Sequence, residues 1–343
     1  MKDNPFVLMF GKEPYVTIPR DQIASEIIGD FSKSIPSSQI YVLIGARGAG
    51  KTVLLSEIYK KIDGEKDWIA VDVNPHRDIL PDLASILYDK GKMKRLFLKG
   101  SLGISFQGLT FSIEGGSPVT SVTTVVERML EHMAKKGKRL LITLDEVTSG
   151  EKVKEFAHDF QAFVRKGFPV YLLMTGLHEN VMSLQNDKSL TFLYRAPKLL
   201  LRPLDSTAVK SSYVKALGVD DKTANELASL CKGYGFGYQL LGYLYFRHGK
   251  IDDELLEEFD YQLRINAYDK IWSSVSENGR KIVRVLCEAD EVSVASILTQ
   301  TGFEDKEFSV YRDRLLQKGV VISKRRGYLS LALPRFDVFV SQN

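Results

Sequence analysis

The chain has 343 residues, of which 44% are hydrophobic and 26% are charged, and its formal net charge is +4. This length allows two or three domains, and the composition is that of a folded globular protein and excludes a disordered or fibrous chain. Because the net charge is small, any binding to nucleic acid has to come from a local basic patch.

The chain lacks the sequence marks of secreted and membrane proteins. Its two cysteines, Cys231 and Cys287, show neither metal-ligand spacing nor a disulfide framework, which fits a reducing compartment. The apolar run near residue 8 is too short for the core of a signal peptide, and no stretch approaches the roughly 18 apolar residues of a membrane span. We therefore expect a soluble, cytoplasmic protein without a membrane segment.

The most informative segment spans residues 40–58. An apolar, β-rich run at 40–44 leads into a glycine-rich turn, and a helical pattern with an apolar face follows. This is the phosphate-binding motif Gly-x-x-x-x-Gly-Lys-Ser/Thr in its strand–loop–helix context, which disfavours an accidental glycine-rich turn. The candidate binding residues are Gly45, Ala46, Arg47, Gly48, Ala49, Gly50, Lys51, Thr52 and Val53.

The chemistry of a phosphate site explains these residue types. Glycines let successive backbone N–H groups turn toward a phosphate, and the helix N-terminus adds its positive dipole end. We expect Lys51 to reach the β and γ phosphates and Thr52 to ligate Mg²⁺. The motif predicts a nucleoside triphosphate ligand, and the absence of the guanine-binding Asn-Lys-x-Asp motif favours ATP.

The segment after residue 76 suggests an insertion. A helical pattern at 77–92 is followed by alternating apolar residues on both sides of Gln107-Gly108, which predicts a hairpin at about 100–116. We expect the helix to belong to the same insertion. The apolar face of the hairpin has to be covered, either by its own domain or by a partner protein.

A second predicted strand ends in the acidic residues that usually accompany a phosphate-binding motif. The continuous apolar run Leu140–Leu144 is typical of a strand buried on both faces, and Asp145 and Glu146 follow it. We expect Asp145 to hold Mg²⁺ and Glu146 to polarise the attacking water. The alternative for Glu146 is a solvated residue at a strand end.

The C-terminal part shows a different order of elements. A connecting helix from residue 254 to 275 precedes a helix capped by Ser276, a short helix ended by Gly302, and a longer helix. A hairpin at 320–334 follows. This order predicts a winged helix. In the versions that bind nucleic acid, the third helix and the hairpin tip make the contacts, and other winged helices bind proteins.

The charges of this part leave two interpretations open. The candidate DNA contacts are Arg312 on the third helix and Lys324, Arg325 and Arg326 at the hairpin tip. Residues 276–343 carry eleven basic and nine acidic residues, fewer basic residues than a dedicated DNA reader usually has. Contact with double-stranded DNA and a solvated tip or protein interface therefore both remain possible.

With both motifs placed, the order of parts resembles an AAA+ ATPase. It is most similar to the bacterial and archaeal Orc-like and STAND-like ATP-binding proteins, which join an ATPase core to a helical lid and a winged helix. The resemblance implies an α/β P-loop NTPase fold with a parallel-sheet core. It implies a core at 1–204, a lid at 205–272 and a winged helix at 273–343.

The resemblance also implies roles for weaker matches. Pro19 and Arg20 match part of the adenine-contacting motif, with Pro19 where the family has glycine. Thr175 matches sensor 1, which responds to the γ-phosphate, although a threonine in a local turn fits equally well. Arg195 matches an arginine finger that reaches a neighbouring subunit of a homo-oligomer, or else caps a helix. Residues 233–237 carry neither a sensor 2 arginine nor the proline of a Gly-x-Pro motif.

These predictions lead to one preferred function and two alternatives. We expect an ATPase of slow turnover that couples its nucleotide state to DNA binding through the winged helix. The first alternative is a STAND-like signalling ATPase whose winged helix binds a protein. The second is an ATP-binding scaffold that does not hydrolyse ATP.

Overall fold

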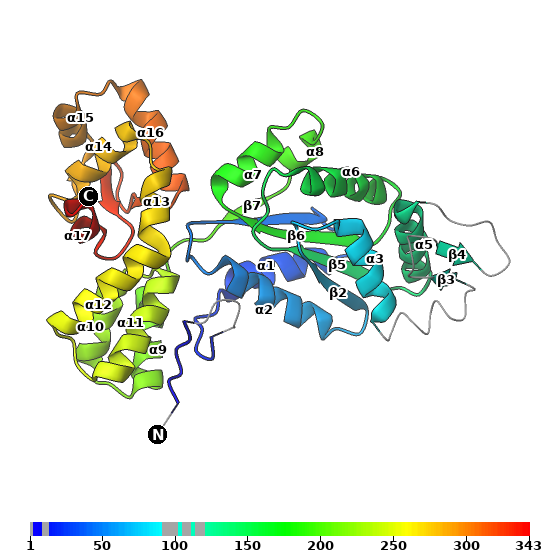
Figure 1. Cartoon of the computed structure of the whole chain (residues 1–343), viewed down its shortest axis with the longest axis horizontal. Helices are drawn as coiled ribbons and strands as arrows, with labels where there is room; N and C mark the ends of the chain where they lie inside the picture. The colour runs from blue at the N-terminus through cyan, green and yellow to red at the C-terminus, as the bar shows by residue number, and fades with distance from the viewer. Residues whose placement is uncertain (1–2, 9–13, 91–101, 105–110, 114–120) are drawn as a thin grey trace. The chain divides into compact units, whose positions relative to one another are not determined.

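The computed structural model describes residues 3–8, 14–90, 102–104, 111–113 and 121–343 (Figure 1). The chain divides into two compact units. The first comprises Met1–Pro19, Gly45–Lys51 and Leu200–Asn343, and the second comprises Arg20–Ile44 and Thr52–Leu199. The glycine-rich loop, Gly45–Lys51, thus groups with the C-terminal part of the chain. The domain boundaries near residues 204 and 272 stay a prediction.

The second unit is built on a sheet with the strand order β2-β5-β6-β1-β7. Adjacent strands pair in parallel between β2 and β5, β5 and β6, and β6 and β1. Residues of β1, β5 and β6 are buried nearly throughout, as their continuous apolar runs predict. The strands are β1 (Ile40–Ile44), β2 (Trp68–Val73), β5 (Arg139–Leu144), β6 (Val170–Gly176) and β7 (Lys198–Leu200).

Helices flank this sheet in the second unit (Figure 1). They are α1 (Asp21–Phe31), α2 (Lys51–Asp63), α3 (Ile79–Asp89), α5 (Val122–Lys135), α6 (Glu151–Arg165), α7 (His178–Gln185) and α8 (Thr191–Tyr194). Ile79, Leu83 and Leu87 of α3 are buried in the same apolar core as the sheet strands, and the assignment of this helix to an insertion stays a prediction. No helix in the described ranges is long and apolar enough to cross a membrane.

Two short strands follow α3. Leu102–Ile104 (β3) pairs antiparallel with Phe111–Ile113 (β4), which is the strand pairing that the alternation predicts. The predicted turn at Gln107-Gly108 lies outside the described residues. What covers the apolar face of this hairpin stays a prediction.

In the first unit, a group of helices that we call the lid follows Leu204. It comprises α9 (Ser206–Leu217), α10 (Asp221–Cys231), α11 (Gly235–His248) and α12 (Asp253–Leu263). Three of these helices begin where an aspartate caps them: Asp205, Asp220 and Asp252 each accept a hydrogen bond from the backbone N–H three residues later. Such caps satisfy N–H groups that a helix start otherwise leaves unpaired.

The connection after the lid is not the single α-helix that the sequence predicts. A π-helical turn, η1 (Arg264–Tyr268), lies between α12 and α13 (Asp269–Ser274). A π-turn accommodates one extra residue, and here it accompanies the burial of Ala267 and Tyr268. This turn is one of the features that local propensity does not encode.

The remaining elements form what we call the C-terminal module, Glu277–Ser341. Its helices are α14 (Glu277–Leu286), α15 (Val294–Thr301), α16 (Asp305–Gln317) and α17 (Phe336–Ser341), and its strands are β8 (Val292–Ser293), β9 (Val321–Ile322) and β10 (Tyr328–Leu331). The pairing of β9 with β10 confirms the predicted hairpin, and β8 joins it on the other edge of β10. The helix α17 was not predicted. The winged-helix interpretation rests on this order of elements and stays a prediction.

The N-terminal segment packs against the lid within the first unit. Phe6 is buried against Gly242 of α11, where an added Cβ would approach its ring to 2.5 Å. Asn4 donates a hydrogen bond to the carbonyl of Tyr243, and Gln239 donates one to the carbonyl of Val16. Asn4, Phe6 and Val16 are therefore anchored to α11.

Candidate nucleotide site

The glycine-rich loop connects β1 to α2. Gly48 and Gly50 have φ angles of 75° and 91°, which favour glycine because a side chain there would be strained. The Lys51 side chain is 8% exposed, and its Nζ donates to the carbonyl oxygens of Gly45 at 3.0 Å and Ala46 at 2.9 Å. The loop thus folds around its own lysine.

The next two carbonyls of the loop also have donors. The hydroxyl of Tyr234 donates to the Arg47 carbonyl at 2.7 Å, and the backbone N–H of Phe236 donates to the Gly48 carbonyl at 2.9 Å. In a trans peptide the N–H points opposite to the C=O. Fixing the Arg47 carbonyl therefore directs the Gly48 N–H to the other side of the loop.

An acid cluster, which we define as Thr52, Asp145, Glu146 and Thr175, lies in the second unit. Asp145 follows β5, and Thr175 belongs to the neighbouring strand β6. The Thr52 hydroxyl donates to Asp145 Oδ2 at 2.8 Å, and the buried Thr175 hydroxyl donates to Asp145 Oδ1. One carboxylate thus links the start of α2 to the end of β6.

Glu146 occupies an unusual backbone position within this cluster. Its φ angle is 55°, in the left-handed region that non-glycine residues rarely adopt. Its backbone N–H donates to Thr175 Oγ1 at 2.9 Å, and the next N–H, of Val147, donates to the Thr175 carbonyl at 2.8 Å. Such strain persists only where surrounding contacts enforce it, and it is common at functional sites.

Asp72 is an acidic residue near this cluster that the sequence analysis did not single out. It lies at the end of β2, and Thr143 of β5 donates to its Oδ1 at 2.6 Å. Partial loss of solvation, with the nearby charge of Asp145, raises the pKa of the Asp72 carboxyl, while the hydrogen bond from Thr143 opposes this. The signal in the sequence was one acid inside an otherwise apolar strand.

The residues present fit a magnesium ion. Mg²⁺ prefers oxygen ligands and is usually held by one or two carboxylates together with water and phosphate oxygens. Thr52 Oγ1 and Asp145 Oδ2, 2.8 Å apart, offer such a pair. In the described part of the chain no group of three or more His, Cys, Asp or Glu side chains could hold a metal by itself. Water and phosphate oxygens would supply the remaining ligands of a Mg²⁺ ion held by Thr52 and Asp145.

Comparison with known proteins gives a family match for the C-terminal part alone. Residues 266–340 match a family described as a domain of unknown function, DUF8462. No curated protein matches the chain. The matched range begins in η1 and ends in α17, so this family includes the turn that joins the lid to the C-terminal module.

Solved structures match the chain over nearly its whole length. The Walker-type ATPase Paby2304 of Pyrococcus abyssi has a TM-score of 0.65 and 15% identity, with 95% of this chain and 96% of that chain covered. The Orc2 protein of Aeropyrum pernix, solved as ADPNP–ADP complexes, has a TM-score of 0.56, 12% identity and coverages of 97% and 96%. The chain has the AAA+ P-loop ATPase fold. The Cdc6p protein of Pyrobaculum aerophilum is similar too, with a TM-score of 0.51, 12% identity and coverages of 97% and 96%.

The AAA+ fold allows the peripheral site residues to be placed. Thr175 is fully buried and bonded to Asp145, so its hydroxyl belongs to the acid cluster and not to an isolated turn. Arg195 is exposed at the C-cap of α8. Pro19 is exposed in the N-terminal segment, and Arg20 is the half-buried N-cap of α1. Their roles toward adenine and toward a neighbouring subunit stay predictions.

The four candidate DNA contacts in the C-terminal module differ from one another. Arg325 pairs with Glu291 at 2.9 Å, and its guanidinium lies 3.5 Å from the ring centroid of Tyr328. Arg312 pairs with Asp313 at 2.8 Å. Lys324 and Arg326 are exposed at the tip of the hairpin. Part of the predicted basic patch is thus engaged within the module itself.

Proposed function

We propose that the protein binds ATP with Mg²⁺ and hydrolyses it slowly, as a switch whose nucleotide state controls its C-terminal module. The observation that carries this proposal is the double hydrogen bonding of Asp145 by Thr52 and Thr175. That arrangement joins the helix after the glycine-rich loop to two strand ends of an AAA+ sheet. At such strand ends α/β proteins bind their ligands.

Each residue has a chemical role in this proposal. Lys51 neutralises the β and γ phosphates, and the loop N–H groups bind phosphate oxygens. Thr52 and Asp145 hold Mg²⁺, which offsets the charge of the phosphates. Glu146 orients and polarises the attacking water, while Thr175 fixes the Glu146 backbone and the Asp145 carboxylate.

The proposal is tested by measuring ATP binding and phosphate release for the full-length protein and for Glu146→Gln. We expect the wild type to bind ATP in a Mg²⁺-dependent way and to release phosphate. The variant should bind ATP with similar affinity and lose turnover, because Glu146 is exposed and the amide keeps its size. ATP binding without phosphate release in either protein would support the non-hydrolysing scaffold, and equal, measurable turnover in both would reject the role of Glu146. A wild type without ATP binding would reject the proposal.

We propose double-stranded DNA as the target of the switch, contacted by Lys324 and Arg326 of the hairpin tip with Arg325 and Arg312 beside them. Electrostatic contact with phosphates makes binding weaken as salt rises. Neutralising Lys324, Arg325 and Arg326 together should weaken DNA binding and lower its salt dependence. Unchanged DNA binding in that triple variant, together with DNA-independent ATPase activity, would reject this part.

A protein partner is the second candidate target, and the ion pairs in the module favour it. Arg325 with Glu291 and Arg312 with Asp313 lower the charge available to DNA. In addition, Val310 of α16 is 48% exposed, which suits a protein interface better than a DNA backbone. This candidate predicts nucleotide-dependent assembly that is indifferent to DNA.

Oligomerisation forms a further part of the proposal. Arg195 is exposed and adjacent to the exposed Tyr194, so it is available to act as an arginine finger in a neighbouring copy. The hairpin of β3 and β4 remains a candidate contact for a partner protein. If Arg195 acts in trans, Arg195→Ala protein mixed with Glu146→Gln protein should regain part of the lost turnover.

A further inference from the structure

The start of α11 is held against the glycine-rich loop by a tyrosine that the proposed function leaves unassigned. Tyr234 is the N-cap of α11, it is 5% exposed, and its hydroxyl donates to the Arg47 carbonyl at 2.7 Å. Burial raises the pKa of this phenol, and the nearby Arg47 opposes the shift. The hydroxyl therefore keeps its proton and acts as a donor at physiological pH.

The contact between Tyr234 and the glycine-rich loop is so close that glycine is required both in the loop and next to the tyrosine. An added Cβ at Gly48 would lie 2.4 Å from the Tyr234 oxygen, and one at Gly235 would lie 2.9 Å from the Gly48 carbonyl oxygen. Gly233 precedes the tyrosine with a φ angle of 70°, where a Cβ would lie 2.4 Å from the Leu204 carbonyl oxygen. The sequence Gly233-Tyr234-Gly235 is thus shaped to bring a hydroxyl to the loop backbone.

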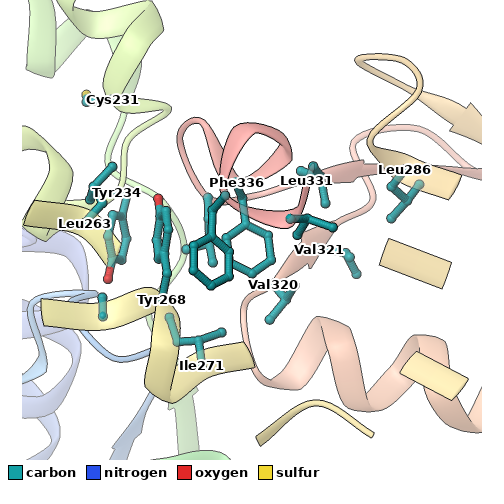
Figure 2. Close-up of a cluster of buried hydrophobic side chains, with 14 of the residues drawn as sticks. Cys231, Tyr234, Leu263, Tyr268, Ile271, Leu286, Val320, Val321, Leu331 and Phe336 are labelled. Carbon is teal, nitrogen blue, oxygen red and sulfur yellow. The ribbon is translucent and has the colours of Figure 1, made fainter. Parts of the chain in front are cut away.

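The other side of Tyr234 faces the turn that leads to the C-terminal module. Its ring packs on that of Tyr268 in η1, with centroids 6.5 Å apart. Tyr268 in turn packs edge-on against Phe336 at 4.9 Å and donates its hydroxyl to the Pro334 carbonyl at 2.5 Å. Figure 2 shows Tyr234, Tyr268 and Phe336 next to one another in the apolar cluster.

We propose that Tyr234 is a positioning residue that couples the glycine-rich loop to the C-terminal module through Tyr268. The proposal rests on nucleotide binding at the loop. The Tyr234 hydroxyl fixes the peptide between Arg47 and Gly48, so that the Gly48 N–H faces the phosphate side of the loop. A phosphate that binds this N–H restrains the same peptide group that the Tyr234 hydroxyl holds. Through the ring contact between Tyr234 and Tyr268, this restraint reduces the mobility of the turn that leads to the C-terminal module.

Tyr234→Phe tests the role because it removes one oxygen atom and keeps the ring. Loss of a buried hydrogen bond that leaves a carbonyl unpaired is expected to weaken ATP and ADP binding by about 5- to 10-fold. The turnover number should stay near the wild-type value, since the acid cluster is untouched. The expected result is thus a raised KM with little change in kcat.

Tyr238→Phe is the matched control. Tyr238 belongs to the same helix, is 2% exposed and shares a hydrogen bond of 2.6 Å with Ser212, outside the loop. It should leave nucleotide affinity unchanged. If Tyr234→Phe and Tyr238→Phe alter affinity equally, or if Tyr234→Phe binds ATP like the wild type, the proposal is overturned. A wild type that fails to bind ATP would instead reject the proposed function.

Coupling to the module is measured by combining Tyr234→Phe with Tyr268→Phe. If the two tyrosines act in series, the double variant should weaken ADP binding no more than the stronger single variant does. Hydrogen exchange of the wild type gives an independent result. Added ADP should slow exchange at residues 234–238 and 264–272 as well as in the loop, and protection confined to the loop would contradict the coupling.

Discussion

The acid cluster in the second unit and the glycine-rich loop in the first are held by different kinds of contact. In the acid cluster, side chains bond to side chains: Asp145 accepts from the hydroxyls of Thr52 and Thr175. In the loop, the bonded groups are backbone carbonyls, and Lys51, Tyr234 and the N–H of Phe236 are the donors. The chemistry of the acid cluster therefore depends on the identity of its side chains, whereas the shape of the glycine-rich loop depends on the residues that pack around it.

This difference bears on what a substitution removes. In the proposed function a change in the acid cluster deletes a group that acts on ATP or its Mg²⁺, so it is expected to alter turnover. A change around the loop alters the direction of N–H groups that remain present, so it is expected to alter affinity. The predictions below separate these two effects.

The largest effect is expected for Lys51→Ala. The variant loses the charge that we propose neutralises the phosphates, and it removes the Lys51 donor from the Gly45 and Ala46 carbonyls, of which Ala46 keeps the N–H of Ala49. Charge-assisted hydrogen bonds of this kind are worth about 1.5–3 kcal/mol each, so we expect ATP affinity to fall roughly 100-fold or more. Isothermal titration with ATP and Mg²⁺ measures this, and an affinity within threefold of the wild type would contradict the role of the loop.

Asp145→Asn is expected to act on turnover more than on affinity. The carboxylate accepts from two hydroxyls, whereas an amide presents one oxygen and one NH₂ group, so one hydroxyl must reverse its role and accept, and the negative charge that would bind Mg²⁺ is lost. We expect phosphate release to fall about 10²- to 10³-fold, as for other losses of a preorganised polar group. Thr52→Ser, which keeps its hydroxyl, is the control and should retain most activity.

The chemistry-bearing residues could be predicted from the sequence, and the contacts of the loop could not. The pattern around Lys51 and the apolar strand before Asp145 are local signals, and the structure has β1, α2 and β5 where they predict. The bond between Tyr234 and Arg47 joins residues 187 positions apart, and no period or spacing encodes it.

Other unpredicted features have similar physical causes. The π-turn η1 depends on the packing of Tyr268, and α3 could be assigned to the core only when its buried face was known. The ion pair of Arg325 with Glu291 neutralises a charge that the sequence pattern counts as available. In each case tertiary contacts decided a feature that local sequence left open.

Substitutions of Thr175 separate the role of its hydroxyl in turnover from its role in packing within the acid cluster. Thr175→Val keeps the shape but removes one acceptor of the Glu146 N–H and the donor to Asp145. The Glu146 N–H keeps Asp145 Oδ1 as an acceptor at 3.1 Å, so the loss is that of the Thr175 hydrogen bonds, worth about 0.5–1.5 kcal/mol each. We expect a lower melting temperature and roughly tenfold slower turnover. Thr175→Ser keeps the hydroxyl and should restore turnover. If valine and serine variants turn over ATP equally, the hydroxyl has no role.

The smallest effect is expected for Asp72→Asn, and its sign depends on pH. Because the pKa of Asp72 is raised in the folded state, the folded protein binds its proton more tightly than the unfolded chain does. The stability of the wild type therefore falls as the pH rises from the unfolded pKa, near 3.9, through the raised folded value. Asparagine carries no charge and can still accept from Thr143, so the variant should melt slightly higher than the wild type at pH 7.5.

This advantage of Asp72→Asn should shrink near pH 4, where the wild-type carboxyl is partly protonated in both states. Thermal unfolding at the two pH values measures it, and Asp72→Ala, which deprives the buried Thr143 hydroxyl of its partner, should melt lower than both. A variant that is more stable at pH 7.5 and yet slower in phosphate release would show that the charge of Asp72 is kept for the chemistry of the acid cluster. A difference in melting temperature between variant and wild type that is equal at both pH values would contradict the raised pKa of Asp72.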